Sequence, residues 1–199
     1  MTGGARKIRC ARPAAPPTVT AMELRPERPA DLDAADDVHR QAFGADGEHV
    51  AALARDLRVL LSPGSGLSLV AVERGRVVGH VLFTRSVLDT AERLVDVLVL
   101  SPVGVLPACQ GRGVGTALIA RGLDLADEQG APAVFLDGSP AYYPRFGFRP
   151  GEPLGFRKPS LRIPDAAFQV RTLGGHRPWT TGTPVYSEIF WRHDAVGLR

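Results

Sequence analysis

The chain has 199 residues, of which 44% are hydrophobic and 23% are charged. This composition suits a globular protein, and no apolar run reaches the roughly 20 residues that would span a bilayer. The formal net charge is +3, but residues 1–21 contain four basic side chains and no acidic one. Residues 22–199 therefore carry 20 basic and 21 acidic side chains. This near-neutral balance excludes a broad basic surface, so neither a nucleic-acid nor a membrane partner is expected.

Residues 1–21 differ in composition from the rest of the chain. They contain three prolines and few large apolar side chains, so we expect a disordered basic leader. They also lack the apolar stretch of a secretory signal. Residues 22–199 are expected to form a single domain. The two cysteines, Cys10 and Cys109, are too few for a disulfide framework, and a cytoplasmic location is expected.

From residue 22 onward, segments with strand-like and helix-like patterns follow one another. Apolar residues at helical spacing predict two early helices, and the short Arg74-Gly75 link between two β-rich runs predicts a hairpin. A longer run of β-branched and apolar residues is typical of a buried central strand. The predicted elements of this half are a strand at 22–25, helices at 29–43 and 47–60, and strands at 67–73, 76–84 and 94–105.

The second half of the chain continues this alternation. A helix is predicted from the glycine-rich segment 111–115 to residue 129, where Gly130 ends it. The further elements are a strand at 133–136, a short helix at 141–146, and strands at 168–173 and 185–191. This order predicts an α/β (α+β) fold in which a mixed sheet carries helices on both faces.

The glycine-rich segment between the strand 94–105 and the following helix is the most informative part of the sequence. Unpaired N–H groups at a helix start attract anions, and glycines let phosphate oxygens approach the backbone. A dinucleotide-binding motif would need a third glycine where Thr116 stands, and a P-loop would need a lysine that is absent. The segment therefore predicts a phosphate site of another kind.

Two motifs resemble those of the GCN5-related N-acetyltransferases (GNAT). Gln110, Gly113 and Gly115 match the acyl-CoA-binding signature Q/R-x-x-G-x-G/A, and residues 141–148 match a Tyr-x-x-x-Gly-Phe element. The second segment is also similar to that of the YhbS-like bacterial subgroup. The likeness extends over about residues 22–191. It implies a mostly antiparallel sheet of about seven strands with a splayed cleft between strands 94–105 and 133–136.

The resemblance also implies an activity, namely direct transfer of the acetyl group of acetyl-CoA to a primary amine without a metal. The pyrophosphate would be held near the helix start. The backbone of the strand 94–105 would pair with the pantetheine arm and polarise the thioester carbonyl, with Pro102 and Gly104 marking a bulge. Ser139 could replace a pantetheine-binding asparagine of the family or only cap a helix. The implied binding residues are Val103, Val105, Gln110, Gly111, Arg112, Gly113, Val114, Gly115, Thr116 and Ser139.

Tyr143 matches the tyrosine that faces the CoA sulfur in the family and would protonate the departing thiolate. From the pattern alone, Tyr143 could equally be a core aromatic, as we expect for Tyr142. Cys109 is not expected to act as a nucleophile, because it would lie near the phosphates. The general base is not evident, and the five histidines show no metal-ligand spacing. The candidate bases are Asp96, Glu48, Glu73 and Glu188.

Several alternatives remain open at this point. The protein could be a catalytically silent acyl-CoA sensor or regulatory module instead of an enzyme. The acceptor could be a small molecule or a peptide or protein amine, with the loops 43–49 and 151–164 as walls of its site. The predicted strand 185–191 could pair with a second copy in a homodimer.

Overall fold

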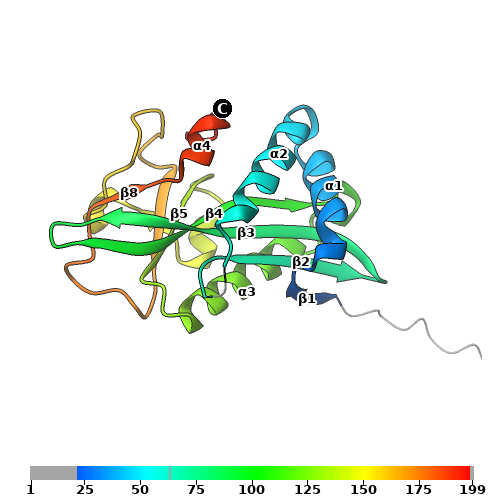
Figure 1. Ribbon diagram of the computed structural model, residues 1–199, viewed down its shortest axis with the longest axis horizontal. Coiled ribbons are helices and arrows are strands. Elements are labelled where there is room, and N and C mark those ends of the chain that lie inside the picture. Colours follow the sequence, from blue (N-terminus) through cyan, green and yellow to red (C-terminus); the bar gives the residue numbers. More distant parts are fainter. Residues whose placement is uncertain (1–21, 63, 198–199) are drawn as a thin grey trace, which may run out of the picture.

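The computed structural model describes residues 22–62 and 64–197. The predicted basic leader, residues 1–21, lies outside the described residues. In the described parts of the chain, no helix combines the length and the apolar character needed to cross a bilayer. The helices, labelled in Figure 1, are α1 (Leu32–Ala42), α2 (Gly47–Leu57), α3 (Val114–Glu128) and α4 (Glu188–Arg192).

The strands form one sheet with the order β1-β2-β3-β4-β5-β7-β6, and β8 pairs with the far end of β3. Only the β4–β5 pair is parallel among the described pairs, so the expectation of a mixed, mostly antiparallel sheet of about seven strands is confirmed. The strands are β1 (Glu23–Pro26), β2 (Leu67–Glu73), β3 (Arg76–Asp89), β4 (Leu94–Val105), β5 (Ala133–Asp137), β6 (Arg149–Pro150), β7 (Phe168–Thr172) and β8 (Thr183–Val185).

The predicted hairpin joins β2 and β3. Arg74 and Gly75 form its turn with φ angles of 50° and 75°. Positive φ at both central residues is the geometry that continues the right-handed twist of two antiparallel strands. The prediction of this hairpin is therefore confirmed, although β3 extends five residues beyond the predicted end at Thr84, to Asp89.

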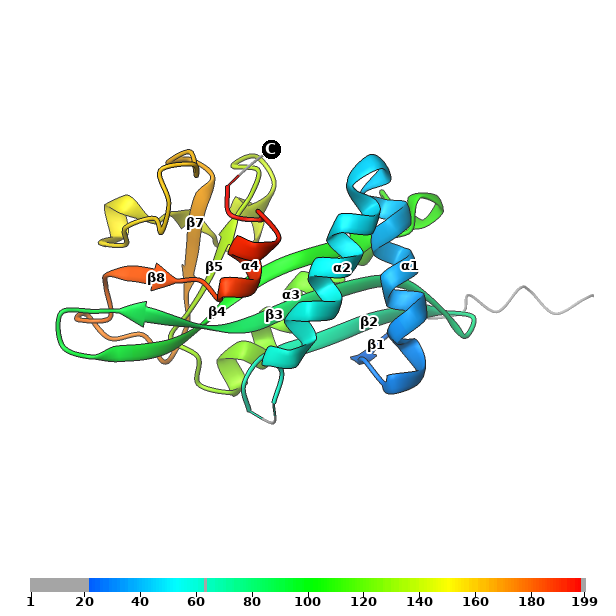
Figure 2. The ribbon, with the colours of Figure 1, turned by 45° about the horizontal axis from the view of Figure 1, so that its top comes forward.

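Helices cover both faces of the sheet, as predicted. Figure 2 shows α1 and α2 in front of the strands and α3 behind them. Behind the sheet, Leu118 and Ile119 of α3 pack with Phe83 of β3. In front, Leu53 and Leu57 of α2 belong to a second apolar cluster together with Phe190 of α4. The central strands are therefore buried on both faces, which explains their continuous apolar runs.

Two irregularities of β4 shape the site. Val81 of β3 pairs with Val103, whereas Phe83 pairs with Leu100, so β4 contains one extra residue between these pairs. This bulge lies beside Pro102, where the sequence predicts one. On its other edge β4 pairs with β5 only at Leu98 and Val99. Beyond these pairs the two strands diverge and leave the predicted cleft.

The prediction of a strand at 185–191 is wrong. The β8 strand ends at Val185, and the chain then forms α4, which Ser187 caps by accepting a hydrogen bond from the N–H of Ile189. Tyr186, Ile189 and Phe190 are buried, and their i, i+3, i+4 spacing is that of a helix facing the core. Of the strand through which a homodimer was expected to pair, only Val185 remains, at the end of β8. The two-residue strand β6 was not predicted, because it is too short to have a pattern.

Candidate functional site

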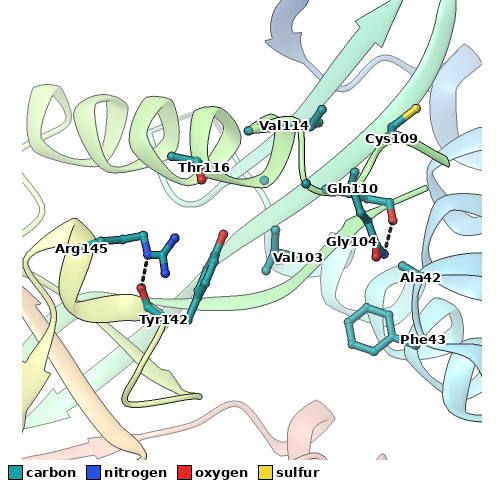
Figure 3. A pocket seen from close by; sticks show the side chains of 14 residues that line it. Ala42, Phe43, Val103, Gly104, Cys109, Gln110, Val114, Thr116, Tyr142 and Arg145 are labelled. Carbon is teal, nitrogen blue, oxygen red and sulfur yellow. Dashed lines mark hydrogen bonds between the residues drawn. The ribbon is translucent and has the colours of Figure 1, made fainter. Parts of the chain in front are cut away.

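A cavity of about 520 Å³ opens where β4 and β5 diverge, and we call it the first cavity (Figure 3). One wall is the end of β4, the second is the glycine-rich segment with the start of α3, and the third is the turn after β5. The end of α1 closes it. The described lining residues are Ala42, Phe43, Val103, Gly104, Val105, Cys109, Gln110, Gly111, Gly113, Val114, Gly115, Thr116, Tyr142 and Arg145.

The start of α3 offers hydrogen-bond donors to this cavity. Gly113 is the N-cap residue with φ of 84°, and no side chain caps the helix. The first intrahelical bond runs from Ala117 N–H to the Gly113 carbonyl. The N–H groups of Val114, Gly115 and Thr116 precede that bond, so they lack helical partners. Open space surrounds the Cβ positions of Gly111 and Gly113, so an anion can approach these donors closely.

The backbone of β4 is directed into the cleft at the two residues expected to contact pantetheine. Leu106 N–H donates to the Val78 carbonyl across the β3 edge. Because successive residues of an antiparallel strand direct their backbone groups to opposite edges, those of Val103 and Val105 face away from β3. The Val105 carbonyl indeed accepts a hydrogen bond of 3.0 Å from the Gln110 side chain on that side (Figure 3).

Three of the predicted binding residues direct their side chains elsewhere. Gln110 lines the cavity, but its amide is bound to the Val105 carbonyl. The Arg112 guanidinium forms an ion pair with Glu73 of β2 at 3.0 Å. The Ser139 hydroxyl accepts a hydrogen bond from Ala141 N–H, as a turn cap does, and Ser139 is absent from the described lining of the first cavity.

Sequence reasoning missed two side chains of the first cavity. The Tyr142 hydroxyl lies 3.6 Å from the Cβ position of Gly115 at the start of α3. Arg145 lies over the Tyr142 ring, 4.5 Å from its centroid, and donates a hydrogen bond to the Tyr142 carbonyl (Figure 3). Arg145 is the only charged residue in the described lining. Both residues belong to the Tyr-x-x-x-Gly-Phe segment, but only the fold shows which cavity they face.

Tyr143 lines a second cavity, of about 390 Å³, which shares Phe43 and Val103 with the first. Its ring packs on Gly138, where a Cβ would lie 2.3 Å from Cε2 of the tyrosine. Burial, with a smaller contribution from Tyr142, raises the pKa of Tyr143 to about 12. The hydroxyl is therefore protonated at neutral pH, which suits an acid and not a base.

The four carboxylates considered as bases lie outside the described linings of both cavities. Glu73 pairs with Arg112, Asp96 with Arg85, Glu48 with Arg40 and Glu188 with Arg192. The loop 43–49 contributes to the second cavity as expected, whereas no residue of 151–164 lines either cavity.

The structure also places Cys109 and two of the histidines, none of which is expected to be catalytic. Cys109 lines the first cavity beside Gln110, apart from Tyr143 in the second. His39 and His80 are buried and contact each other at 2.7 Å between ring nitrogens. Within residues 22–62 and 64–197, no three His, Cys, Asp or Glu side chains are grouped as metal ligands would be.

The diverging β4 and β5, with a glycine-opened helix at the end of their cleft, define a GNAT-type acyltransferase. Comparison with known proteins agrees, because the family model described as "Acetyltransferase (GNAT) domain" matches residues 23–151. The chain therefore belongs to the GNAT family of N-acetyltransferases.

Individual relatives are similar over most of the chain. The Escherichia coli K12 protein named "Uncharacterized N-acetyltransferase YhbS" is 34% identical over 86% of this chain and 99% of its own length. The related YjhQ of the same strain is 38% identical over 59% of this chain and 65% of its own. The crystal structure of E. coli YhbS in complex with CoA has a TM-score of 0.75 at 30% identity, covering 90% of this chain and 97% of that chain. A Brucella melitensis GNAT acetyltransferase in complex with acetyl-CoA has a TM-score of 0.67 at 33% identity, covering 86% and 99%.

Proposed function

We propose that this protein binds acetyl-CoA in the first cavity and transfers its acetyl group directly to a primary amine. The observation that carries the proposal is the set of N–H groups at the start of α3 that lack helical partners and belong to residues lining the first cavity. Gly111 and Gly113 leave the space that a diphosphate needs there. The related proteins from E. coli and B. melitensis, solved with CoA and acetyl-CoA, support the same ligand.

The rest of the first cavity suits the other parts of this donor. The pantetheine arm would run along the cleft-facing backbone of Val103 and Val105 as an added strand. The N–H of Val103, next to the bulge, would donate to the thioester oxygen and stabilise the negative charge that develops on it. Arg145 would pair with a phosphate from the opposite wall.

Tyr143 is the proposed acid for the leaving thiolate. Tyr143 belongs to the wall of the second cavity, which meets the first at Val103. The hydroxyl is protonated at neutral pH, so its proton is available to sulfur as the C–S bond breaks, although the raised pKa makes it a weaker acid than an exposed tyrosine.

Tyr143→Phe keeps the ring on Gly138 and removes only the hydroxyl. We expect kcat, measured as CoA release with n-propylamine as acceptor, to fall about 100-fold, since general acids typically contribute this much. The Kd for acetyl-CoA should stay within about twofold in calorimetry. An unchanged kcat would exclude Tyr143 as the acid. Tight acetyl-CoA binding without transfer to a broad panel of amines and lysine peptides would favour the alternative, a silent sensor.

Arg145→Gln removes the one charge in the described lining of the first cavity. We expect the Kd for acetyl-CoA to rise about tenfold, and the variant to lose part of the salt dependence of binding, because exposed ion pairs are screened by salt. Calorimetry at 50 and 300 mM NaCl measures both effects. Arg149→Gln, an exposed arginine outside both described cavity linings, is the matched control. If Arg145→Gln and the wild type show the same Kd and salt dependence, Arg145 does not contact phosphate.

A further inference from the structure

The second cavity is the open route to the reacting end of the proposed donor. It shares Val103 with the first cavity and contains the bulge of β4 in its wall. An acyl group held beside Val103 would therefore face into it. Its other described walls come from the α1–α2 connection, the end of β5, the Tyr143 turn and the last residues of the described chain.

Asp137 is the last residue of β5 and a wall of this cavity. Its Oδ1 accepts a hydrogen bond of 3.1 Å from the Tyr186 hydroxyl, and its Oδ2 accepts one of 3.4 Å from Gly197 N–H. Both donors are uncharged. A mostly buried carboxylate whose hydrogen bonds come from neutral donors is costly to keep ionised, and a cation bound beside it would offset that cost. Burial raises the pKa of Asp137 to about 6, although both hydrogen bonds lower it.

The charged groups around Asp137 are mostly acidic. Asp46 and His49 face the cavity from the α1–α2 side, and Asp194 faces it from the C-terminal side, where it pairs with Arg162. The described lining contains no lysine or arginine. The cavity therefore attracts cations, and Asp137 is the carboxylate on the strand that leads directly into Gly138 and the Tyr143 turn.

We propose that Asp137 binds the ammonium group of the acceptor in the second cavity and accepts its first proton. The inference rests on the acetyl transfer proposed above. It adds a general base, a role that none of the four carboxylates considered from the sequence fills. It also implies an acceptor that enters as a primary ammonium ion small enough to reach the end of β5.

The proton and bond balance of the step is complete. The ammonium gives one proton to Asp137 and becomes a neutral amine, whose lone pair forms a bond to the thioester carbon while the carbonyl electrons move to oxygen. Collapse of this adduct restores the C=O bond and breaks the C–S bond. Sulfur takes the Tyr143 proton, and the second amine proton restores Tyr143. The products are the amide, CoA and one proton, which Asp137 releases to solvent.

Asp137→Asn and Tyr186→Phe test the proposal together, with n-propylamine and 1,3-diaminopropane as acceptors. For Asp137→Asn we expect transfer to fall about 100-fold with an unchanged Kd for acetyl-CoA. Tyr186→Phe keeps the carboxylate but removes a hydrogen bond that lowers its pKa. The acid limb of its pH–rate profile should therefore move up by about one pH unit while the high-pH rate is retained. Asp96→Asn, an exposed carboxylate on β4 outside the cavity, is the control.

A purely structural role for Asp137 would not move the acid limb in Tyr186→Phe. Equal rates for wild type and Asp137→Asn would overturn the proposal while leaving acetyl transfer intact. If the wild type binds acetyl-CoA but acetylates neither these two amines nor the broad panel of amines and lysine peptides, the proposed function fails, and the binding of ammonium at Asp137 is then tested separately. For that test, the ¹³C carboxyl signal of Asp137 is titrated with and without n-propylammonium chloride. A lower Asp137 pKa in its presence supports the site, and an unchanged pKa overturns it.

Discussion

Replacing Gly113 with glutamate is expected to raise the Kd for acetyl-CoA about 100-fold. Gly113 caps α3 with a positive φ and has no heavy atom within 4 Å of its Cβ position, so the new side chain can project into the first cavity. Its carboxylate would compete for the helix N–H groups and repel the diphosphate. Repulsion between unit charges about 4 Å apart ranges from roughly 1 to 4 kcal/mol between water and a protein surface, and each 1.4 kcal/mol is a factor of ten.

Gly130→Glu is the matched control for this experiment. Gly130 follows the other end of α3, has φ of 77° and is equally unobstructed, so both variants have the same left-handed backbone strain. Gly130 does not line the first cavity. Calorimetry should therefore show normal acetyl-CoA affinity for Gly130→Glu and a Kd about 100-fold higher for a folded Gly113→Glu. Equal affinity in both variants would mean that the diphosphate lies elsewhere.

The sequence predicted those parts of the fold and site that depend on local pattern. The strands 67–73 and 94–105 have the predicted bounds, because β-branched runs ended by turn residues are specified locally. The helix start near Gly113 could be predicted because successive glycines indicate a backbone with positive φ, which other residues rarely adopt. The family's motifs include Tyr143, which the structure places on the wall of the second cavity.

Features made by distant parts of the chain could not be predicted in this way. Asp137 acquires its surroundings from Tyr186 and Gly197, which are 49 and 60 residues further along. Tyr142 and Arg145 line the first cavity only because the fold brings their turn opposite the start of α3, where the Tyr142 hydroxyl lies 3.6 Å from the Cβ position of Gly115. Residues 188–192 were misinterpreted because Ile189, Phe190 and Trp191 read as an apolar run when their burial is ignored. In the structure Trp191 is 41% exposed and the other two are buried, which is a helical pattern.

A buried polar network supports the wall of the first cavity from behind. Glu27, with a side chain only 5% exposed, pairs with Arg58 at 2.8 Å and accepts a hydrogen bond of 2.6 Å from Ser68. His80 lies 3.4 Å from Glu27 and contacts His39 of α1. His39 in turn packs on Gly104, where a Cβ would lie 2.8 Å from its Nδ1. The network therefore connects Glu27, the residue after β1, to Gly104, the β4 residue that lines the first cavity.

Glu27→Gln is expected to lower the free energy of unfolding by about 3 kcal/mol at pH 7. Burial alone would raise the pKa of Glu27, but hydrogen bonds from His80, Arg58 and Ser68 outweigh it and lower the pKa to about 2. In the unfolded chain Glu27 has its ordinary pKa of 4.5, so between pH 4.5 and pH 2 the unfolded chain binds more protons than the folded one. The stabilisation is complete above pH 4.5 and is lost as the pH falls to 2, at about 1.4 kcal/mol per unit of pKa shift.

Protonation of His39 at low pH is expected to lower the free energy of unfolding of both the wild type and Glu27→Gln. Burial, followed by the fields of His80 and Arg58, lowers the pKa of His39 to about 3, so stability falls as the pH drops from 6.5. Urea unfolding from pH 7 to pH 3 should thus show the free energy of unfolding falling in both proteins. The difference in this free energy between wild type and Glu27→Gln should narrow below pH 4.5. Glu188→Gln, whose 82%-exposed side chain lies 3.9 Å from Arg192, should differ from wild type by less than about 0.5 kcal/mol. A constant difference between wild type and Glu27→Gln at every pH would show that the lost stability comes from packing and not from the charge of Glu27.

Removing the charge of Glu27 should also loosen the packing of α1 against Gly104, so Glu27→Gln is expected to bind acetyl-CoA more weakly even where it remains folded.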